Sequence, residues 1–259
     1  MELFLKKIFG IGFLVMFVLG FSACGEDTKS SNNRLNANNG FYTDEDSLYW
    51  IKDGKVLSLD LEEGEIDDEW GEISKDLDKK KILGLASAFE VFVKDGNELK
   101  MCDPETAEYD SLFDFILPEQ YSSIINLGGS VVFQQNKKTI SVYAFGKEVK
   151  TFDFDKDYDS AFYLGDSLNM VGLIKGKEID LISVNGIVAP DYKPIIKKHF
   201  ELDKQYDAYV GCTVDYQEMF WEKTAYIGCI EGNKIKFYDI KKGQFAKIPL
   251  TGEEMSWTF

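Results

Sequence analysis

VGLIKGKEIDLISVNG, residues 171–186, shows the unit from which most of this chain is built. An apolar run over residues 171–174 leads into a short polar turn at Gly176, and a second run over residues 179–184 ends in another turn at Gly186. Glycine supplies the positive φ that tight hairpin turns need, and alternation with a period of two is typical of half-buried strands. The stretch therefore predicts a β-hairpin followed by a turn into a third strand.

The same unit recurs four more times, at residues 48–65, 89–106, 131–146 and 226–243. The anchors of the first turn are spaced by 42, 40, 40 and 56 residues, and they are Gly54, Gly96, Asn136, Gly176 and Gly232. A further apolar run precedes four of the units, at residues 82–85, 124–127, 161–164 and 208–210. Four strands repeated with a period of about 40 residues are the signature of a β-propeller blade.

The sequence thus predicts an all-β fold, a β-propeller of five four-stranded blades over residues 41–259. The units resemble generic propeller repeats of bacterial exported proteins, in which an apolar run, an Asp-Gly turn and a Leu-Asp pair follow one another. The first unit has these as Leu48-Tyr49-Trp50, Asp53-Gly54 and Leu59-Asp60. The alternatives are a pair of stacked sheets or a meander of hairpins.

Two parts of this ring are less regular. The first unit has no obvious inner strand, and either Phe41-Tyr42 or the C-terminal residues 255–259 could supply it, the latter closing the ring from the other terminus. The spacing of 56 residues before the last unit indicates an insertion near residues 191–206. Apolar residues between Pro194 and Leu202 suggest that it is a short helix or lid.

The N-terminal segment has the pattern of a targeting sequence. Lys6 and Lys7 precede an apolar stretch over residues 8–21, which is too short to span a bilayer as a helix. It ends in Phe21-Ser22-Ala23-Cys24, which resembles the lipobox of bacterial lipoproteins, although Leu is the more common residue at the position of Phe21. The resemblance implies a signal peptide over residues 1–23 and diacylglycerol on Cys24; the alternative is an ordinary signal peptide with a chance cysteine.

The composition of residues 24–40 is rich in Asn and Ser, which is typical of a flexible tether. Three other cysteines follow it: Cys102, Cys212 and Cys229. Cys212 and Cys229 occur in neighbouring apolar runs, so a cross-strand disulfide is one possibility; small buried apolar side chains are the other.

Little in the sequence points to catalysis, and we expect no metal site, no cofactor and no catalytic group. His199 is the only histidine, which excludes a histidine-based triad or a two-histidine metal site within one chain; we expect it to be a solvated helix residue. The alternative function is a carbohydrate-active hydrolase, which would need two or three inner-strand carboxylates converging on one pocket. The candidates for that role are Asp46, Glu90, Asp166, Asp207 and Asp215.

The charge balance argues against nucleic acid as a partner, because 45 acidic residues outweigh 29 basic ones. Lysines nevertheless gather at the first turn of every unit. We expect these turns to share one face of the propeller and to meet an anionic component of the cell envelope, such as a polymer or an acidic protein patch. The alternative is that these lysines serve only to keep the exposed turns soluble. They are Lys52, Lys55, Lys94, Lys137, Lys138, Lys175, Lys177 and Lys234.

The function expected from the sequence is therefore that of a lipid-anchored, extracytoplasmic binding or scaffold protein. Its partners would be the cell membrane or outer membrane, through the lipid on Cys24, and a component of the cell envelope.

Overall fold

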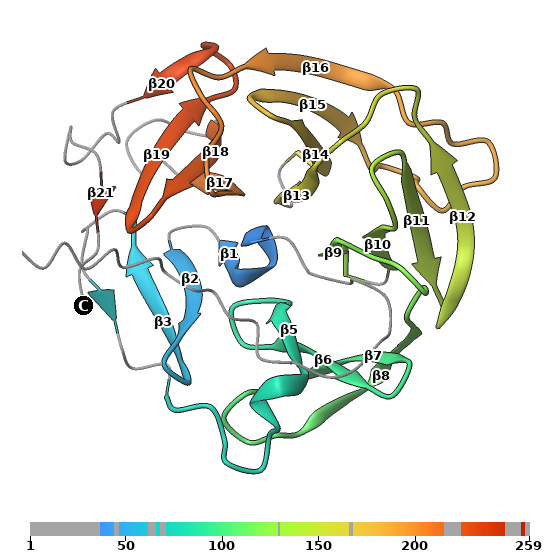
Figure 1. Cartoon of the computed structure of the whole chain (residues 1–259), viewed down its shortest axis with the longest axis vertical. Helices are drawn as coiled ribbons and strands as arrows, with labels where there is room; N and C mark the ends of the chain where they lie inside the picture. Colours follow the sequence, from blue (N-terminus) through green and yellow to red (C-terminus); the bar gives the residue numbers. More distant parts are fainter. Residues whose placement is uncertain are drawn as a thin grey trace, which may run out of the picture.

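The predicted strands form five sheets that stand as the blades of a ring (Figure 1). The computed structural model describes residues 37–43, 47–61, 66–67, 71–128, 130–165, 168–214, 224–246 and 255–256. In each sheet, the strands follow one another in chain order from the centre of the ring outward, and neighbours pair antiparallel. This confirms the five-bladed propeller with four-stranded blades.

The first three blades follow the repeat closely, and the apolar run before each hairpin is the innermost strand. Blade 1 consists of β1 (Phe41–Thr43), β2 (Ser47–Lys52), β3 (Lys55–Asp60) and β4 (Ile66–Asp67). Blade 2 consists of β5 (Ile82–Leu85), β6 (Val91–Asp95), β7 (Glu98–Cys102) and β8 (Tyr109–Ile116). Blade 3 consists of β9 (Ser123–Asn126), β10 (Ser130–Gln134), β11 (Thr139–Ala144) and β12 (Lys147–Asp153).

The last two blades complete the ring. Blade 4 consists of β13 (Ser160–Leu164), β14 (Met170–Lys175), β15 (Glu178–Ser183) and β16 (Ile196–Glu201). Blade 5 consists of β17 (Ala208–Val214), β18 (Thr224–Glu231), β19 (Lys234–Asp239) and β20 (Gln244–Ala246). Two short 3₁₀ helices, η1 (Ala37–Gly40) and η2 (Lys79–Lys81), precede β1 and β5.

The turns between second and third strands have the geometry that the glycines predicted. In blade 1, Lys52 pairs with Lys55 across a two-residue turn in which Asp53 and Gly54 have φ values of 50° and 80°. Both positions therefore adopt the positive φ of a tight hairpin turn. Blade 3 differs, because residues 135–138, which join β10 to β11, contain no glycine.

The predicted helical insertion at residues 191–206 is wrong. Residues 196–201 form β16, the outermost strand of blade 4, and many of the extra residues lie in the connection 184–195 that leads to it. Ile195 and Ile196, which suggested a helix face, are 60% and 49% exposed, whereas Phe200 is buried against blade 5. His199 consequently lies on a strand and not on a helix.

The C-terminal strand does not close the ring as one alternative supposed. Residues 255–256 form β21, which pairs with Lys234 and Ile235 at the start of β19 and so extends blade 5. The inner strand of blade 1 is β1, which confirms the other alternative, Phe41-Tyr42. Residues 257–259 lie outside the described part of the chain.

The core consists of five apolar clusters, one between each pair of adjacent blades. In β10, for example, Val131 and Phe133 pack toward blade 2, while Val132 between them packs toward blade 4. Side chains of a strand alternate between the two faces of its sheet. A strand covered on both faces is therefore apolar throughout, which explains the unbroken apolar runs of the second strands.

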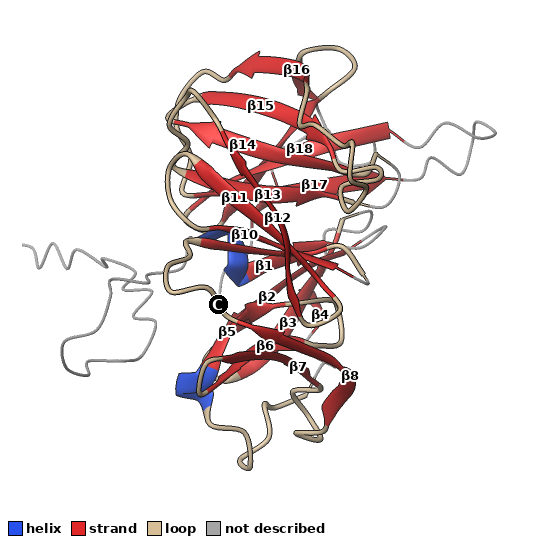
Figure 2. Cartoon of the chain, turned by 90° about the vertical axis from the view of Figure 1, so that its right-hand side faces the viewer, coloured by secondary structure: helices blue, strands red, loops and turns tan. Residues whose placement is uncertain are grey.

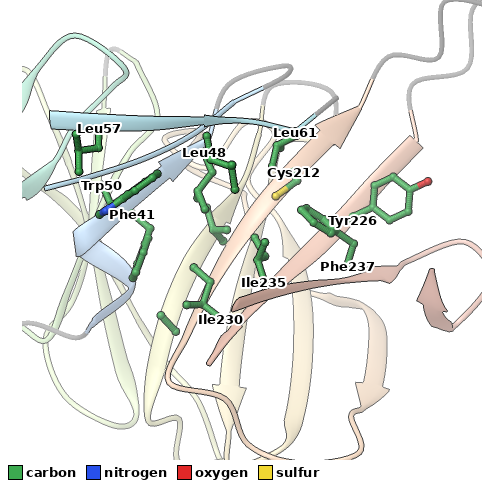
Figure 3. Close-up of a cluster of buried hydrophobic side chains, with 13 residues drawn as sticks. Phe41, Leu48, Trp50, Leu57, Leu61, Cys212, Tyr226, Ile230, Ile235 and Phe237 are labelled. Atoms are coloured by element: carbon green, nitrogen blue, oxygen red, sulfur yellow. The ribbon is translucent and has the colours of Figure 1, made fainter. Parts of the chain in front are cut away.

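The ring is closed by side-chain packing between blades 1 and 5, because every blade is built from a contiguous stretch of chain. Figure 3 shows this closure cluster, in which Phe41, Leu48 and Trp50 of blade 1 face side chains of blade 5. Its centre on the blade 5 side includes Ile230, Ile235 and Phe237, all at most 2% exposed.

The disulfide between Cys212 and Cys229 does not form, and both thiols are free and buried. The two residues lie on neighbouring strands, but Cys212 faces blade 1 and Cys229 faces blade 4, on opposite sides of the same sheet. The other alternative, small buried apolar side chains, is the correct one. Burial raises the pKa of the Cys212 thiol to about 12.

Replacing Ile235 by alanine should lower the free energy of unfolding by about 2–5 kcal/mol, because it leaves a cavity in the closure cluster. Each blade needs its neighbours to bury its faces, so the whole ring should unfold in one transition at lower denaturant. Fluorescence and circular dichroism during chemical denaturation measure this. The matched control is Ile195→Ala at an exposed position, which should change stability by no more than about 0.5 kcal/mol; two separate transitions in the wild type would contradict the closed ring.

Candidate functional site

The chain enters the ring through its centre. Figure 1 shows η1 in the middle of the five blades, surrounded by their inner strands. Asn38 and Asn39 of η1 are only 7% and 6% exposed. Residues 37–40 are thus part of the folded domain, although their composition assigned them to the tether that was expected to extend to residue 40.

The two asparagines satisfy backbone groups on edges of inner strands that no other strand pairs with. Asn39 donates from Nδ2 to the Ile124 carbonyl at 2.6 Å and accepts from the Ile124 N–H at 3.2 Å. Asn38 donates to the Ala161 carbonyl at 3.0 Å and accepts from the Tyr209 N–H at 2.8 Å. Buried backbone groups without partners are costly, so these bonds stabilise the inner strands of blades 3, 4 and 5.

Blade 2 approaches η1 closely because a glycine of its inner strand has no side chain. Gly84 of β5 has a φ of 150°, and a Cβ atom there would lie 2.1 Å from the carbonyl oxygen of Asn39. Glycine is therefore required for β5 to approach the centre as closely as it does. The inner strands of blades 2, 3, 4 and 5 thus all contact η1.

The contacts of η1 fix which face of the ring the chain enters. Ile124, Ala161 and Tyr209 are each the second residue of their inner strand. Inner strands begin where the connections between blades end, and the turns between second and third strands lie at that same end. We call this the entry face and the opposite one the far face. Figure 2, a view from the side, shows η1 and η2 on the same side of the ring.

All eight lysines predicted to bind an anionic partner lie at the turns of the entry face. Their role in binding stays a prediction. Lys137 and Lys138 form ion pairs with Asp159 at 3.3 Å and Asp157 at 3.7 Å, and Lys177 pairs with Glu201 at 2.6 Å. The carboxylates come from the ends of blades and the connections between them. The positive charge of these three lysines is therefore balanced locally.

Lys94 and Lys175 are exposed and, within the described part of the chain, form no ion pair. Lys234 is also exposed, whereas Lys52 and Lys55 are half-buried beside the first hairpin turn. Among the described residues, the entry face thus carries lysines that form ion pairs and two, Lys94 and Lys175, that do not, which the sequence did not distinguish.

The carboxylates of the hydrolase alternative do not converge in the described residues. Glu90 lies in the β5–β6 connection on the far face, where it accepts a hydrogen bond from Ser87 Oγ at 3.2 Å. Asp207 lies just before β17 on the entry face, where it accepts from the Gly232 N–H at 2.9 Å. Each carboxylate fixes a turn, and the ring separates the two. Asp46, Asp166 and Asp215 lie outside the described residues.

A charge cluster around the buried Asp180, between blades 3 and 4, was not predicted. Asp180 of β15 is 3% exposed and accepts hydrogen bonds from His199 Nδ1 at 2.6 Å, Tyr158 Oη at 2.7 Å and Lys156 Nζ at 3.0 Å. Burial raises the pKa of Asp180, but the three hydrogen bonds outweigh it, so that the pKa lies below its ordinary value. The cluster stabilises the contact between these two blades.

No group of three or more histidine, cysteine, aspartate or glutamate side chains in the described ranges is arranged to hold a metal ion. The same ranges contain no helix that is long and apolar enough to cross a membrane.

Comparisons with known proteins give the fold alone. No protein-family model matches the chain, and no curated protein does. The β-propeller domain of Cps50 (Swd1) from Myceliophteria thermophila is 9% identical, with a TM-score of 0.40 over 82% of this chain and 70% of that one. The WD40 β-propeller domain of Doa1 is 13% identical, with a TM-score of 0.36 over 84% of this chain and 68% of that one.

The computationally designed Ika8 protein is 15% identical, with a TM-score of 0.36 over 80% of this chain. The chain spans 59% of the length of that designed protein. The distant structural neighbours thus include WD40-type propellers.

Replacing Asn39 by alanine should lower the free energy of unfolding by about 1–3 kcal/mol, because it leaves the N–H and carbonyl of Ile124 without their partner. Thermal or urea denaturation measures the loss. Asn97→Ala in an exposed turn is the control and should have little effect. Equal stabilities of the two variants would show that η1 does not support the inner strands.

Replacing Asp180 by asparagine should lower the free energy of unfolding at neutral pH by about 1.5–3 kcal/mol, because it removes charged hydrogen bonds. The pKa of Asp180 is lowered in the folded state, so its stabilisation is present above the ordinary value of 3.8 and is lost as the pH falls below it. The free energy of unfolding, measured between pH 7 and pH 3, should therefore fall less steeply with decreasing pH in Asp180→Asn than in the wild type. Parallel curves for the two proteins would contradict this role.

Proposed function

We propose that this chain is a lipid-anchored, extracytoplasmic protein whose propeller serves as a binding or scaffold domain. The observation that carries the proposal is the sequence Phe21-Ser22-Ala23-Cys24 after a basic and then an apolar stretch. The thiol of Cys24 would accept diacylglycerol, and cleavage before it would leave the lipid at the new N-terminus. The membrane holding it would be the cell membrane or the outer membrane.

The arrangement of the ring agrees with binding at its surface. The asparagines of η1 occupy the centre at the entry face, so a partner that approaches this face meets η1 before any central site. Glu90 and Asp207, candidates for hydrolysis, are each engaged in a turn on opposite faces. The surfaces left for a partner are the two faces and the rim. An anionic partner would meet the lysines of the entry face.

Replacing Cys24 by alanine tests the anchor. Two or more acyl chains hold a protein stably on a bilayer, whereas a protein without them washes off. We expect Cys24→Ala to lose incorporation of labelled fatty acid and to accumulate as the unprocessed precursor. Cys102→Ala, which alters a buried thiol in blade 2, is the control and should be labelled like the wild type. Labelled and processed Cys24→Ala protein would refute the lipoprotein assignment.

A further inference from the structure

We infer that the entry face of the propeller lies against the membrane and that its unpaired lysines contact anionic lipid headgroups. This inference rests on the proposed anchor at Cys24. It identifies the anionic partner of the lysines as the bilayer surface, and it leaves the far face and the rim for other partners.

The length of chain before the ring sets the first constraint. Cys24 and Ala37 are 13 positions apart, so even a fully extended chain between them spans at most about 45 Å. A flexible chain of this length has a root-mean-square span of about 20 Å. The lipid therefore holds Ala37 close to the bilayer.

The place where the chain enters the ring sets the second constraint. Ala37 begins η1, which lies at the centre of the entry face. A globular domain of about 220 residues is about 40–45 Å across. To turn the far face to the bilayer, the tether would have to run from the centre to the rim and then past the side of the ring. That path uses nearly all of its reach, so the tether disfavours the far face and holds the entry face and its rim close to the membrane.

The exposed lysines of the entry face supply the contact. Lys80 of η2, Lys94 and Lys175 are exposed and form no ion pair in the part of the chain that the structure describes. Lysines close to an anionic bilayer are attracted to it, and this attraction weakens as salt is raised. On the far face of blade 2, Glu105 and Glu108 are exposed, and an anionic surface repels them. Exposed carboxylates such as Asp53, Asp78 and Asp155 also lie on the entry face, so the attraction is local to these lysines and the length of the tether is the main constraint on orientation.

Exposed apolar side chains lie on the far face. Phe89 and Phe145, which are 60% and 91% exposed, lie in connections of the far face, and so does Val188 at 49%. With the entry face on the bilayer, these side chains point away from it.

The orientation can be measured without the natural lipid. Residues 25–259 contain every described contact, and a histidine tag in place of residues 1–24 attaches this chain to vesicles that contain a nickel-chelating lipid. A dye is placed on blade 2 either by Asn97→Cys on the entry face or by Glu108→Cys on the far face. The three native cysteines are buried, and burial raises their pKa, so the dye reacts with the new thiol.

Energy transfer to an acceptor in the bilayer then reports which face is nearer. In vesicles of equal parts phosphatidylcholine and phosphatidylglycerol, we expect at least about twofold greater transfer from position 97 than from position 108, falling as salt is raised. Joint reversal of Lys80, Lys94 and Lys175 to glutamate should reduce that ratio. Joint reversal of Lys147, Lys193 and Lys197, exposed lysines near the far-face ends of blades 3 and 4, should leave it unchanged.

Equal transfer from the two positions, or greater transfer from position 108, would overturn the inference. The inference would also be overturned if the two triple variants changed the ratio of transfer from positions 97 and 108 equally. Because the tag replaces Cys24, none of these outcomes depends on natural lipidation, which the Cys24→Ala experiment tests separately.

Discussion

Each blade of this protein is apolar on both faces, and that constraint determines the rest of the structure. A sheet with one apolar face can cover it by packing against a single neighbour, but a sheet such as β9–β12 needs a neighbour on each side. Five such sheets satisfy one another only as a closed ring. The contact between blades 1 and 5 is therefore an apolar cluster like those between the other blades, and in the described residues each of these two blades is built from its own contiguous stretch of chain.

Closing the ring creates a second requirement at its centre. The inner strands pair on one edge only, so their other edges present backbone donors and acceptors to the middle of the ring. Asn38 and Asn39 meet that requirement, because an amide side chain offers both a donor and an acceptor, as a neighbouring strand would. The same contact fixes the face from which the preceding chain leaves, and so connects the packing of the ring with its orientation on a membrane.

The repeat predicted the blades because turn glycines and apolar runs are local signals. Outer strands gave weaker signals: β16 buries little more than Phe200, and its exposed isoleucines resembled a helix face. The role of η1 could not be predicted from its composition, because a segment rich in asparagine can be either a solvated tether or a buried contact. The cluster around Asp180 depends on the pairing of Asp180 in β15 with His199 in β16 and on the connection from the preceding blade. The sequence predicted the lysines of the turns but not the carboxylates that pair with three of them, because those come from the end of β16 and from the connection between blades 3 and 4.

Amide hydrogen exchange at Ile124 and Tyr209 tests most directly whether the N-terminal residues belong to the core of the ring. Both N–H groups lie on inner-strand edges and bond only to asparagine side chains of η1 among the contacts described. If η1 occupies the centre as a structural part, these two amides should exchange as slowly as the paired amides of the second strands. Exchange at the rate of the exposed turns would show that the inner edges are open to water and would contradict the account.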